Sequence, residues 1–285
     1  MMRPPPQGRV TPKQDGVYGI EVGGWKITST NKRILNSVEK EQLQEELEAP
    51  ELPEMVFGHS KFELLHTSSG VMLRFDALGA LKGWDKNAPS LKVAYSSEWA
   101  RTRDTSAKSI AKEFDWTFTT HYKGDIVPQP SEGGRLARPE PTEERIDLEK
   151  LKKPDPILWF DEVVLFEDEL ADNGTAFLTV KVRVMPRSFY CLMRFWMRLD
   201  DVLFRVHDTR LYHEFGWEYV LREYQTREDT YKHLKQIGVS PHHQLSSLSP
   251  CYHVVLVLTK TVCPRNSPPT PASWQIPTWL LPFFL

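Results

Sequence analysis

The stretch after Asp172-Asn173-Gly174 alternates strictly between apolar and polar side chains, and this alternation restricts the fold more than any other feature. Successive side chains of a β-strand point to opposite faces, so a period of two predicts a strand with one buried face. Asn-Gly favours a tight hairpin turn, and the largely apolar run from Ile157 to Phe166 precedes it, so we predict an antiparallel hairpin. The buried face comprises Leu178, Val180, Val182 and Val184, and the other face Thr179, Lys181 and Arg183.

Two further strands extend this hairpin. Phe189 to Leu199 is apolar on one face and carries Arg194 and Arg198 on the other. Asp200-Asp201 then turns the chain into a fourth strand, Val202 to Thr209. Because strands joined by short turns pair antiparallel, we predict a central meander over about residues 157–209.

Helices are predicted around this sheet. Ser37 to Leu47 follows Asn36, a capping residue, with Glu39 three positions on. Further expected elements are a short helix from Asp76 through Leu81, a hairpin of Lys61–His66 with Val71–Phe75, a strand with Trp116, Phe118, Thr120 and Tyr122 on one face, a helix over 143–152 and a last helix from Thr226 to Gln236. Since helices surround locally paired strands, the fold class is α+β: a single domain with a mainly antiparallel sheet and peripheral helices.

The chain divides into three segments. Residues 1–15 are Pro-rich and polar, so we predict a disordered N-terminus. Residues 16–237 form the domain, which includes a loop at 124–142 with four prolines and three glycines. We expect this loop to be mobile, because long irregular loops in compact domains are mobile or functional.

The third segment, residues 238–285, differs in composition from the rest. All 38 acidic residues precede Gly238, and the last 48 residues contain eight prolines and no acid. We therefore predict a disordered tail. Gly238-Val239 is compatible with reading through a GT splice donor, so we hypothesise that the tail is translated intron or an alternative terminal exon; a genuine disordered tail is the alternative.

Composition excludes several classes of function. The net charge of −2 provides no strong basic field, so we expect neither nucleic acid nor a membrane as partner. No apolar run reaches the roughly 18 residues of a membrane-spanning helix. Cys191, Cys251 and Cys263 include no CxxC pair, which is typical of a reducing compartment. We expect a cytoplasmic protein, and a nuclear location is also compatible.

Motifs for catalysis are missing. His213-Glu214 lacks the second histidine that an HExxH zinc site needs, and no Gly-x-Ser-x-Gly elbow, Walker loop or Rossmann fingerprint occurs. Paired carboxylates can hydrolyse glycosides, so a hydrolase using Glu167, Asp168 and His213 is one alternative. Charges beside a hairpin turn are more typical of a solvated rim. We therefore expect no enzyme activity, no cofactor and no metal.

Two polar segments, Asp208 to Glu214 and Tyr219 to Tyr224, combine charged and aromatic residues. Arginine and tyrosine are favoured at interfaces, so these segments suit a recognition surface. The alternative is internal pairing of Arg210 and Arg222 with Glu214, Glu223 or Asp168.

Five motifs occur in register along the chain. They are Leu52–Gly58, Asp115–Thr120, Leu165–Leu170, Lys181–Pro186 and Asp208–Glu214. Together they resemble the TIPRL family of TOR-pathway regulators, over about residues 16–227. The resemblance implies a single mixed α/β domain without enzyme activity or cofactor. It also implies binding to the catalytic subunits of type 2A protein phosphatases, whose C-terminal tail is held in a cleft.

The resemblance implies a contact surface that includes Ile146 and Asp208, both of which match the family's pattern. Two further positions of this surface depart from the pattern: Gly79 stands where several relatives have an acid, and Val206 where they have methionine. We expect these two departures to affect the affinity for the phosphatase.

We add Arg205 and Arg210, because a peptide that ends in a carboxylate favours a bidentate arginine at a strand end. The expected function is that of a non-catalytic monomer that modulates, and restrains, phosphatase activity or assembly in TOR signalling. A TOR-pathway scaffold that does not touch the phosphatase is an alternative, besides the hydrolase.

Overall fold

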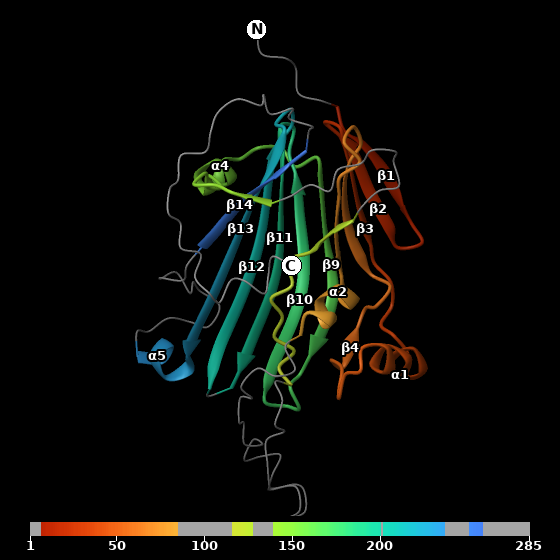
Figure 1. Cartoon of the computed structure of the whole chain (residues 1–285), viewed down its shortest axis with the longest axis vertical. Coiled ribbons are helices and arrows are strands. Elements are labelled where there is room, and N and C mark those ends of the chain that lie inside the picture. The colour runs from red at the N-terminus through yellow and green to blue at the C-terminus, as the bar shows by residue number, and fades with distance from the viewer. Residues whose placement is uncertain (1–6, 85–115, 128–138, 201, 237–250, 259–285) are drawn as a thin grey trace, which may run out of the picture.

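The computed structural model describes residues 7–84, 116–127, 139–200, 202–236 and 251–258. Within them, two antiparallel sheets dominate (Figure 1), a smaller one mainly in red to orange and a larger one mainly in green to blue. The smaller sheet has the strand order β1-β2-β3-β5-β6-β7, and the larger β4-β9-β10-β11-β12-β13-β14-β8. Most neighbouring strands follow one another in sequence, so both sheets are largely meanders.

The smaller sheet comes mainly from the N-terminal part of the chain. Its strands are β1 (Arg9–Gln14), β2 (Val17–Val22), β3 (Trp25–Thr30), β5 (Lys61–His66), β6 (Met72–Asp76) and β7 (Asp125–Val127). β5 pairs antiparallel with β6, which confirms the predicted hairpin.

The larger sheet contains the predicted meander. Its strands are β4 (Met55–Val56), β8 (Pro139–Pro141), β9 (Trp159–Asp168), β10 (Gly174–Val184), β11 (Ser188–Leu199), β12 (Leu203–Glu214), β13 (Tyr219–Thr230) and β14 (Cys251–Val257). The meander is confirmed and extends beyond residue 209, because β12 continues to Glu214 and β13 follows it.

Short helices lie at the periphery of the sheets (Figure 1). They are α1 (Ser37–Glu46), α2 (Ala77–Lys82), α4 (Leu148–Lys152) and α5 (Tyr231–Gln236). The sheets and these helices together confirm the α+β class. None of the described helices has the length and apolar character needed to cross a membrane.

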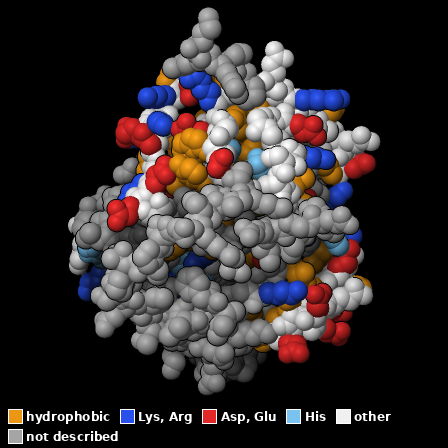
Figure 2. Space-filling view, turned by 45° about the horizontal axis from the view of Figure 1, so that its top comes forward, with side chains coloured by type: hydrophobic (Ala, Val, Ile, Leu, Met, Phe, Trp, Pro, Cys, Tyr) orange, Lys and Arg blue, Asp and Glu red, His pale blue; other side chains and the backbone are white. Residues whose placement is uncertain are grey.

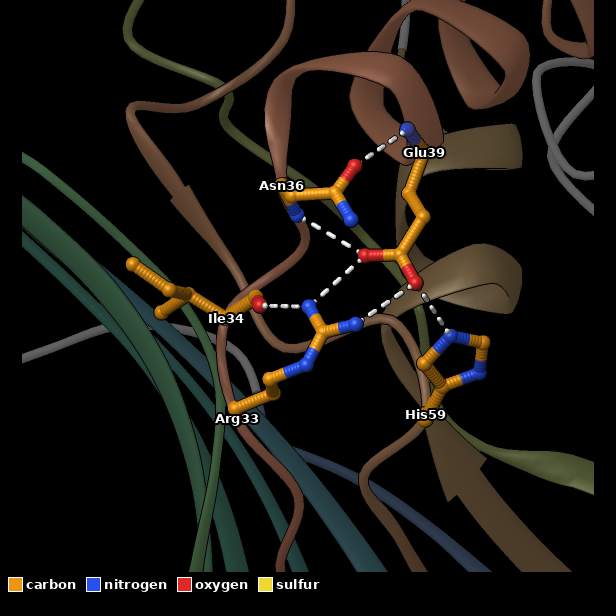
Figure 3. Close-up of polar contacts among 5 residues, drawn as sticks. All are labelled: Arg33, Ile34, Asn36, Glu39 and His59. Carbon is orange, nitrogen blue, oxygen red and sulfur yellow. Dashed lines mark hydrogen bonds and ion pairs between the residues drawn. The ribbon is translucent and has the colours of Figure 1, made fainter.

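Figure 3 shows how α1 begins. The Asn36 side chain accepts a hydrogen bond from the Glu39 N–H at 2.9 Å, and the Glu39 carboxylate accepts one from the Asn36 N–H at 2.8 Å. This reciprocal pair satisfies two backbone donors that the helix leaves open. Arg33 donates to both Glu39 oxygens, at 2.8 and 2.9 Å, and His59 Nε2 lies 3.8 Å from Glu39 Oε1. The predicted helix with Asn36 as its cap is confirmed.

One hydrophobic core lies between the two sheets. Trp25 of β3 packs edge-to-face on Phe189 of β11, with ring centroids 5.1 Å apart, and Tyr18 of β2 lies 5.2 Å from Trp159 of β9. The predicted apolar face of β10 is buried in this core: Leu178, Val180, Val182 and Val184. Burying side chains of this size stabilises the fold by roughly 1.5–3 kcal/mol each.

Three segments within the domain differ from the sequence predictions. Residues 116–122 do not form a strand, because Phe118 adopts a positive φ of 56° that interrupts the extended chain. The last helix does not start at Thr226, which still pairs with His207 in the sheet. The loop at 124–142 begins and ends in strands, β7 and β8, while residues 128–138 lie outside the described part.

Both terminal predictions of disorder are wrong where the structure describes the chain. Residues 9–14 form β1, an edge strand whose exposed side chains explain its polar sequence. In the tail, β14 pairs with β13 from Tyr219↔Val257 to Gln225↔Cys251, and the side chains of Leu256 and Leu258 are buried. Residues 251–257 of the tail therefore join the sheet between β13 and β8, and residues 238–250 and 259–285 lie outside the described part.

Candidate partner-binding surface

The strand β12 presents different side chains on the two faces of the larger sheet. Its odd-numbered residues face the smaller sheet: Leu211 belongs to the shared core, and the His207 ring lies 5.7 Å from that of Phe195. Its even-numbered residues face away, where Tyr212 packs in a second hydrophobic cluster with Ile146. We call these two sides the inner face and the outer face.

Asp208 lies at the centre of β12 on the outer face. Its Oδ1 accepts from Arg194 Nε at 2.7 Å, and its Oδ2 accepts from Arg194 Nη2 and Arg210 Nη2, each at 2.9 Å. Arg194 is its neighbour across the sheet, on β11. Only 2% of the Asp208 side chain is exposed. The carboxylate is therefore enclosed by two arginines that it shares.

The charges around Asp208 control whether its carboxylate is protonated. Burial by itself would raise the pKa of Asp208, but the hydrogen bonds and positive charges of Arg194 and Arg210 outweigh burial and hold that pKa below its ordinary value. In turn, the hydrogen bond that Arg194 donates to Asp208 raises the pKa of Arg194. Asp208 and Arg194 therefore carry opposite charges at neutral pH.

The cluster continues onto β13 through a neutral side chain. Gln225 Oε1 accepts from Arg210 Nη2 at 2.9 Å and from Arg227 Nη2 at 2.6 Å. A ladder of three arginines, joined by Asp208 and Gln225, thus crosses β11, β12 and β13. Guanidinium groups held in this way suit bidentate recognition of carboxylates.

Ile146 and Val206 lie on the same outer face, on either side of this ladder. The Ile146 N–H donates to Glu223 Oε1 at 2.7 Å, and its side chain packs against Tyr212. Val206 is paired with Trp196 of β11. The structure therefore brings together Ile146, Val206 and Asp208, as the resemblance implies, but all three side chains are buried.

Arg205 does not join this group. It lies on the inner face, where its Nε donates to Glu228 at 2.7 Å and its Nη1 donates to Thr119. Neither Arg205 nor Arg210 lies at a strand end, because β12 is longer than predicted and ends at Glu214. The sequence alone did not show where β12 ends, since the length of the strand depends on its pairing with β11 and β13.

Gly79 lies apart as well, in α2 beside the smaller sheet. A Cβ added there would come within 2.8 Å of Asp125 Oδ2 and 2.9 Å of the Tyr122 ring. Tyr122 donates to that same Asp125 oxygen at 2.7 Å. The absence of a side chain at Gly79 leaves room for this pair.

A second group of cations lies on the inner face, and sequence reasoning missed most of it. Arg222 is 5% exposed, and its Nη2 donates to the carbonyl oxygens of Lys123 and Gly124. Its guanidinium carbon and the Lys123 Nζ lie 5.0 and 4.3 Å from the centroid of the Tyr224 ring. Burial lowers the pKa of Arg222 and of Lys123.

The proposed pairing of Arg222 with Glu214, Glu223 or Asp168 is therefore wrong: its described hydrogen bonds go to backbone carbonyls. Lys123 lies 99 residues away along the chain, so no local pattern could reveal the contact.

The residues of the hydrolase alternative do not converge. Asp168 is buried and accepts from the N–H groups of Glu54 and Leu170, at 2.8 and 2.6 Å. His213 lies among core aromatics, and burial lowers its pKa to about 4. Across the described ranges, no group of three or more His, Cys, Asp and Glu is placed to hold a metal ion. Asp168 and His213 therefore both have structural surroundings, a pair of backbone N–H groups and the aromatic core.

Figure 2 shows acidic and basic side chains interspersed around groups of hydrophobic side chains on the described part of one face. This mixture agrees with the net charge of −2 and differs from the one-signed stripe of a nucleic-acid-binding surface.

Comparison with known proteins decides the family. The model of the TIP41-like family matches residues 55–235. The human TIP41-like protein is 41% identical over 256 residues, which cover 89% of this chain and 92% of the relative. A TIP41-like protein from Dictyostelium discoideum is 43% identical over 222 residues, which cover 76% of this chain and 81% of the relative. The chain belongs to the TIP41-like family.

Membership of the TIP41-like family confirms the resemblance drawn from the five motifs. The Saccharomyces cerevisiae relative, 36% identical over 244 residues, is named a type 2A phosphatase activator; the match covers 80% of this chain and 67% of that protein. The human match covers more of this chain than residues 1–237 could supply, so it reaches into the tail. Part of the tail thus resembles the family, contrary to the prediction that it lies outside the fold.

Proposed function

We propose that this TIP41-like chain binds the catalytic subunit of type 2A protein phosphatases directly and uses the outer face of the larger sheet to do so. Two yeast relatives are named type 2A phosphatase activators, which supports a role in phosphatase regulation. The observation that carries the proposal is the arginine ladder around Asp208, flanked by Ile146 and Val206. Ladders of this kind, beside apolar side chains, resemble the arginine-rich centres of protein interfaces.

The inner face offers a second contact, for the phosphatase's C-terminal tail. Lys123 and Arg222 are cations that lack a carboxylate among their described hydrogen-bond partners, and both lie against the ring of Tyr224. A terminal carboxylate could accept hydrogen bonds from them and add negative charge to that of Asp125 nearby. We therefore place the tail's carboxylate near Lys123 and Arg222, in preference to Arg205.

Binding is proposed to restrain the phosphatase, because a partner seated near the active site and holding the tail limits access of substrates and of other subunits. The setting is TOR signalling in the cytoplasm. The two yeast relatives are named activators, which predicts a rise in phosphatase activity and not a fall. Measuring phosphatase activity in the complex therefore decides between the two directions.

Direct binding is tested with two purified components, this chain and a recombinant catalytic subunit, by calorimetry. A one-to-one complex and a lower rate of phosphopeptide hydrolysis are expected. If the two components do not associate, the scaffold alternative holds instead. If the complex forms and the rate rises, binding stands and restraint is wrong.

The tail contact is tested by comparing the full catalytic subunit with one that lacks its last residues. Truncation should weaken binding about tenfold, the loss of one buried charge contact. Lys123→Gln should reduce that difference, whereas Lys61→Gln, on the smaller sheet, should leave it unchanged. Equal affinity of both forms for the wild-type chain would contradict the tail contact.

A further inference from the structure

We infer that Asp208 is a positioning residue, and that the guanidinium of Arg194 makes the contact with a carboxylate-rich segment of the partner. This inference rests on the proposed function and specifies the chemistry of its outer-face site.

Asp208 has almost no surface to offer a partner. Its side chain is 2% exposed, and both its oxygens already accept hydrogen bonds from arginines. A partner could reach this carboxylate only by displacing Arg194 or Arg210. Breaking a buried, hydrogen-bonded ion pair is costly, so direct recognition of Asp208 is unfavourable.

Arg194 has the opposite character. Its side chain is 38% exposed, although its Nε and Nη2 are fixed on Asp208. Its Nη1 group donates to no described residue. An arginine has five N–H donors in a rigid fork, so fixing one edge of the group presents the remaining donors to solvent in a defined direction.

The charge balance identifies the kind of partner. Arg194 and Arg210 share the negative charge of Asp208, and Glu223, opposite Arg210 across the strands, is buried and accepts from the Ile146 N–H. Among these four charged side chains Arg194 is the most exposed, so the charge that faces solvent here is positive. Because the exposed Arg194 is cationic and the less exposed Arg210 and Asp208 hold it in place, an acidic protein segment suits this face.

Val206 and Ile146 limit where such a segment can lie. Both are buried on the outer face, on either side of Arg194, and they help to hold the sheet and the segment before α4 in place. Substitutions at these two residues would thus act through the surface they support, as we infer for Asp208.

A double-mutant cycle tests the inference, with affinity for the purified catalytic subunit measured at several salt concentrations. Arg194→Gln should weaken binding at least about tenfold and flatten its salt dependence, because a partner-facing charge is lost. Asp208→Asn should also weaken binding in the wild-type background. In the Arg194→Gln background, Asp208→Asn should change affinity by less than about twofold, since the group it positions is gone.

Two measurements guard against effects of folding. Urea unfolding of each variant of the cycle identifies any loss of stability, because every variant that lacks the Asp208 carboxylate also leaves Arg210 without its counter-charge. Arg74→Gln is the matched control, because Arg74 is 34% exposed and also bonded to an acid, Glu63, but lies on the smaller sheet. It should leave affinity unchanged.

The outcomes distinguish a failure of the proposed function from a failure of the inference on Arg194 and Asp208. If the wild-type chain does not bind the catalytic subunit, the proposed function fails and this inference with it. If the wild type binds and folded Arg194→Gln binds equally well, only the inference fails. Independent, additive losses from Asp208→Asn and Arg194→Gln would likewise overturn it, because Asp208 would then contact the partner itself.

Discussion

Asp208 and Asp168 are both buried carboxylates of the larger sheet, with 4% and 6% of their surface exposed, yet their pKa values shift in opposite directions. Arginines hold the pKa of Asp208 below its ordinary value against the effect of burial. Burial raises the pKa of Asp168 to about 6, although two backbone N–H groups act against it. A counter-charge, and not hydrogen bonding alone, therefore decides the direction.

The difference assigns the two residues different roles. Asp168 connects the N–H of Glu54 to that of Leu170 and so fixes the chain before β4 to the turn after β9. Burial raises its pKa against the effect of these two hydrogen bonds, and the shift indicates no catalytic base. Asp208 instead orients arginines on an outer face, where their remaining donors are available.

The largest expected effect is on stability, and it compares the two carboxylates directly. Asp208→Ala should lower the free energy of unfolding by about 3 kcal/mol at pH 7, because it leaves Arg194 and Arg210 without their shared counter-charge. Asp168→Ala should cost less, since removing a carboxylate that is unfavourable to ionise offsets part of the loss of two hydrogen bonds. Urea unfolding measures both, and equal losses would contradict the role of the counter-charge.

The second effect is a difference in pH dependence. Because the folded pKa of Asp168 is raised to about 6 from an ordinary 3.8, its favourable contribution is fully present below pH 4 and is lost as the pH rises through 6. Relative to Asp168→Asn, which cannot ionise, the wild type should lose about 3 kcal/mol between pH 4 and pH 7.

Asp208→Asn provides the contrast for that measurement. The folded pKa of Asp208 is lowered, so its contribution is present above the ordinary pKa and is lost as the pH falls through the folded value. The difference in unfolding free energy between wild type and Asp168→Asn should therefore change with pH in the opposite direction to the difference between wild type and Asp208→Asn. Parallel curves would show that the environments of the two carboxylates do not differ as described.

The sequence predicted those parts of the fold that local patterns determine. Alternation in β10, its hairpin pairing with β9 and the cap at Asn36 depend on nearby residues, and all are confirmed. The turn of that hairpin is longer than the tight Asn173-Gly174 turn that was predicted, because it runs from Glu169 to Asn173 and Gly174 already belongs to β10. The extent of β12 and the order of the tail depend on pairing with distant strands. Polar or Pro-rich composition therefore misled the predictions for residues 9–14 and 251–257.

The candidate site was predictable only in part, for the same reason. The period of two would have placed Arg205 and Asp208 on opposite faces of one strand, so that separation was available from the sequence. The pairing of Asp208 with Arg194 needed the register between β11 and β12. The contact of Arg222 with the carbonyl of Lys123 needed the path of a loop that no periodic pattern describes.

The smallest expected effect concerns Glu39, an exposed carboxylate that has both kinds of partner (Figure 3). The hydrogen bond from Arg33 contributes most to lowering its pKa to about 2, and the Asn36 N–H contributes next. NMR titration of Arg33→Ala should therefore show a rise in the pKa of Glu39, whereas Asn36→Ala, which keeps the backbone N–H, should leave that pKa near 2. Asn36→Ala should cost about 1 kcal/mol of stability through loss of the helix cap.

This last measurement removes the arginine at a carboxylate where burial affects the pKa less than either hydrogen bond does. If the pKa of Glu39 stayed near 2 in Arg33→Ala, one backbone N–H would suffice to lower the pKa of an exposed carboxylate. Burial alone would then have to explain why two backbone N–H groups do not lower the pKa of Asp168. The arginines beside Asp208 would no longer be needed to explain its lowered pKa. A clear rise instead means that a guanidinium lowers the pKa of a carboxylate more than a backbone N–H does, at the surface as in the sheet.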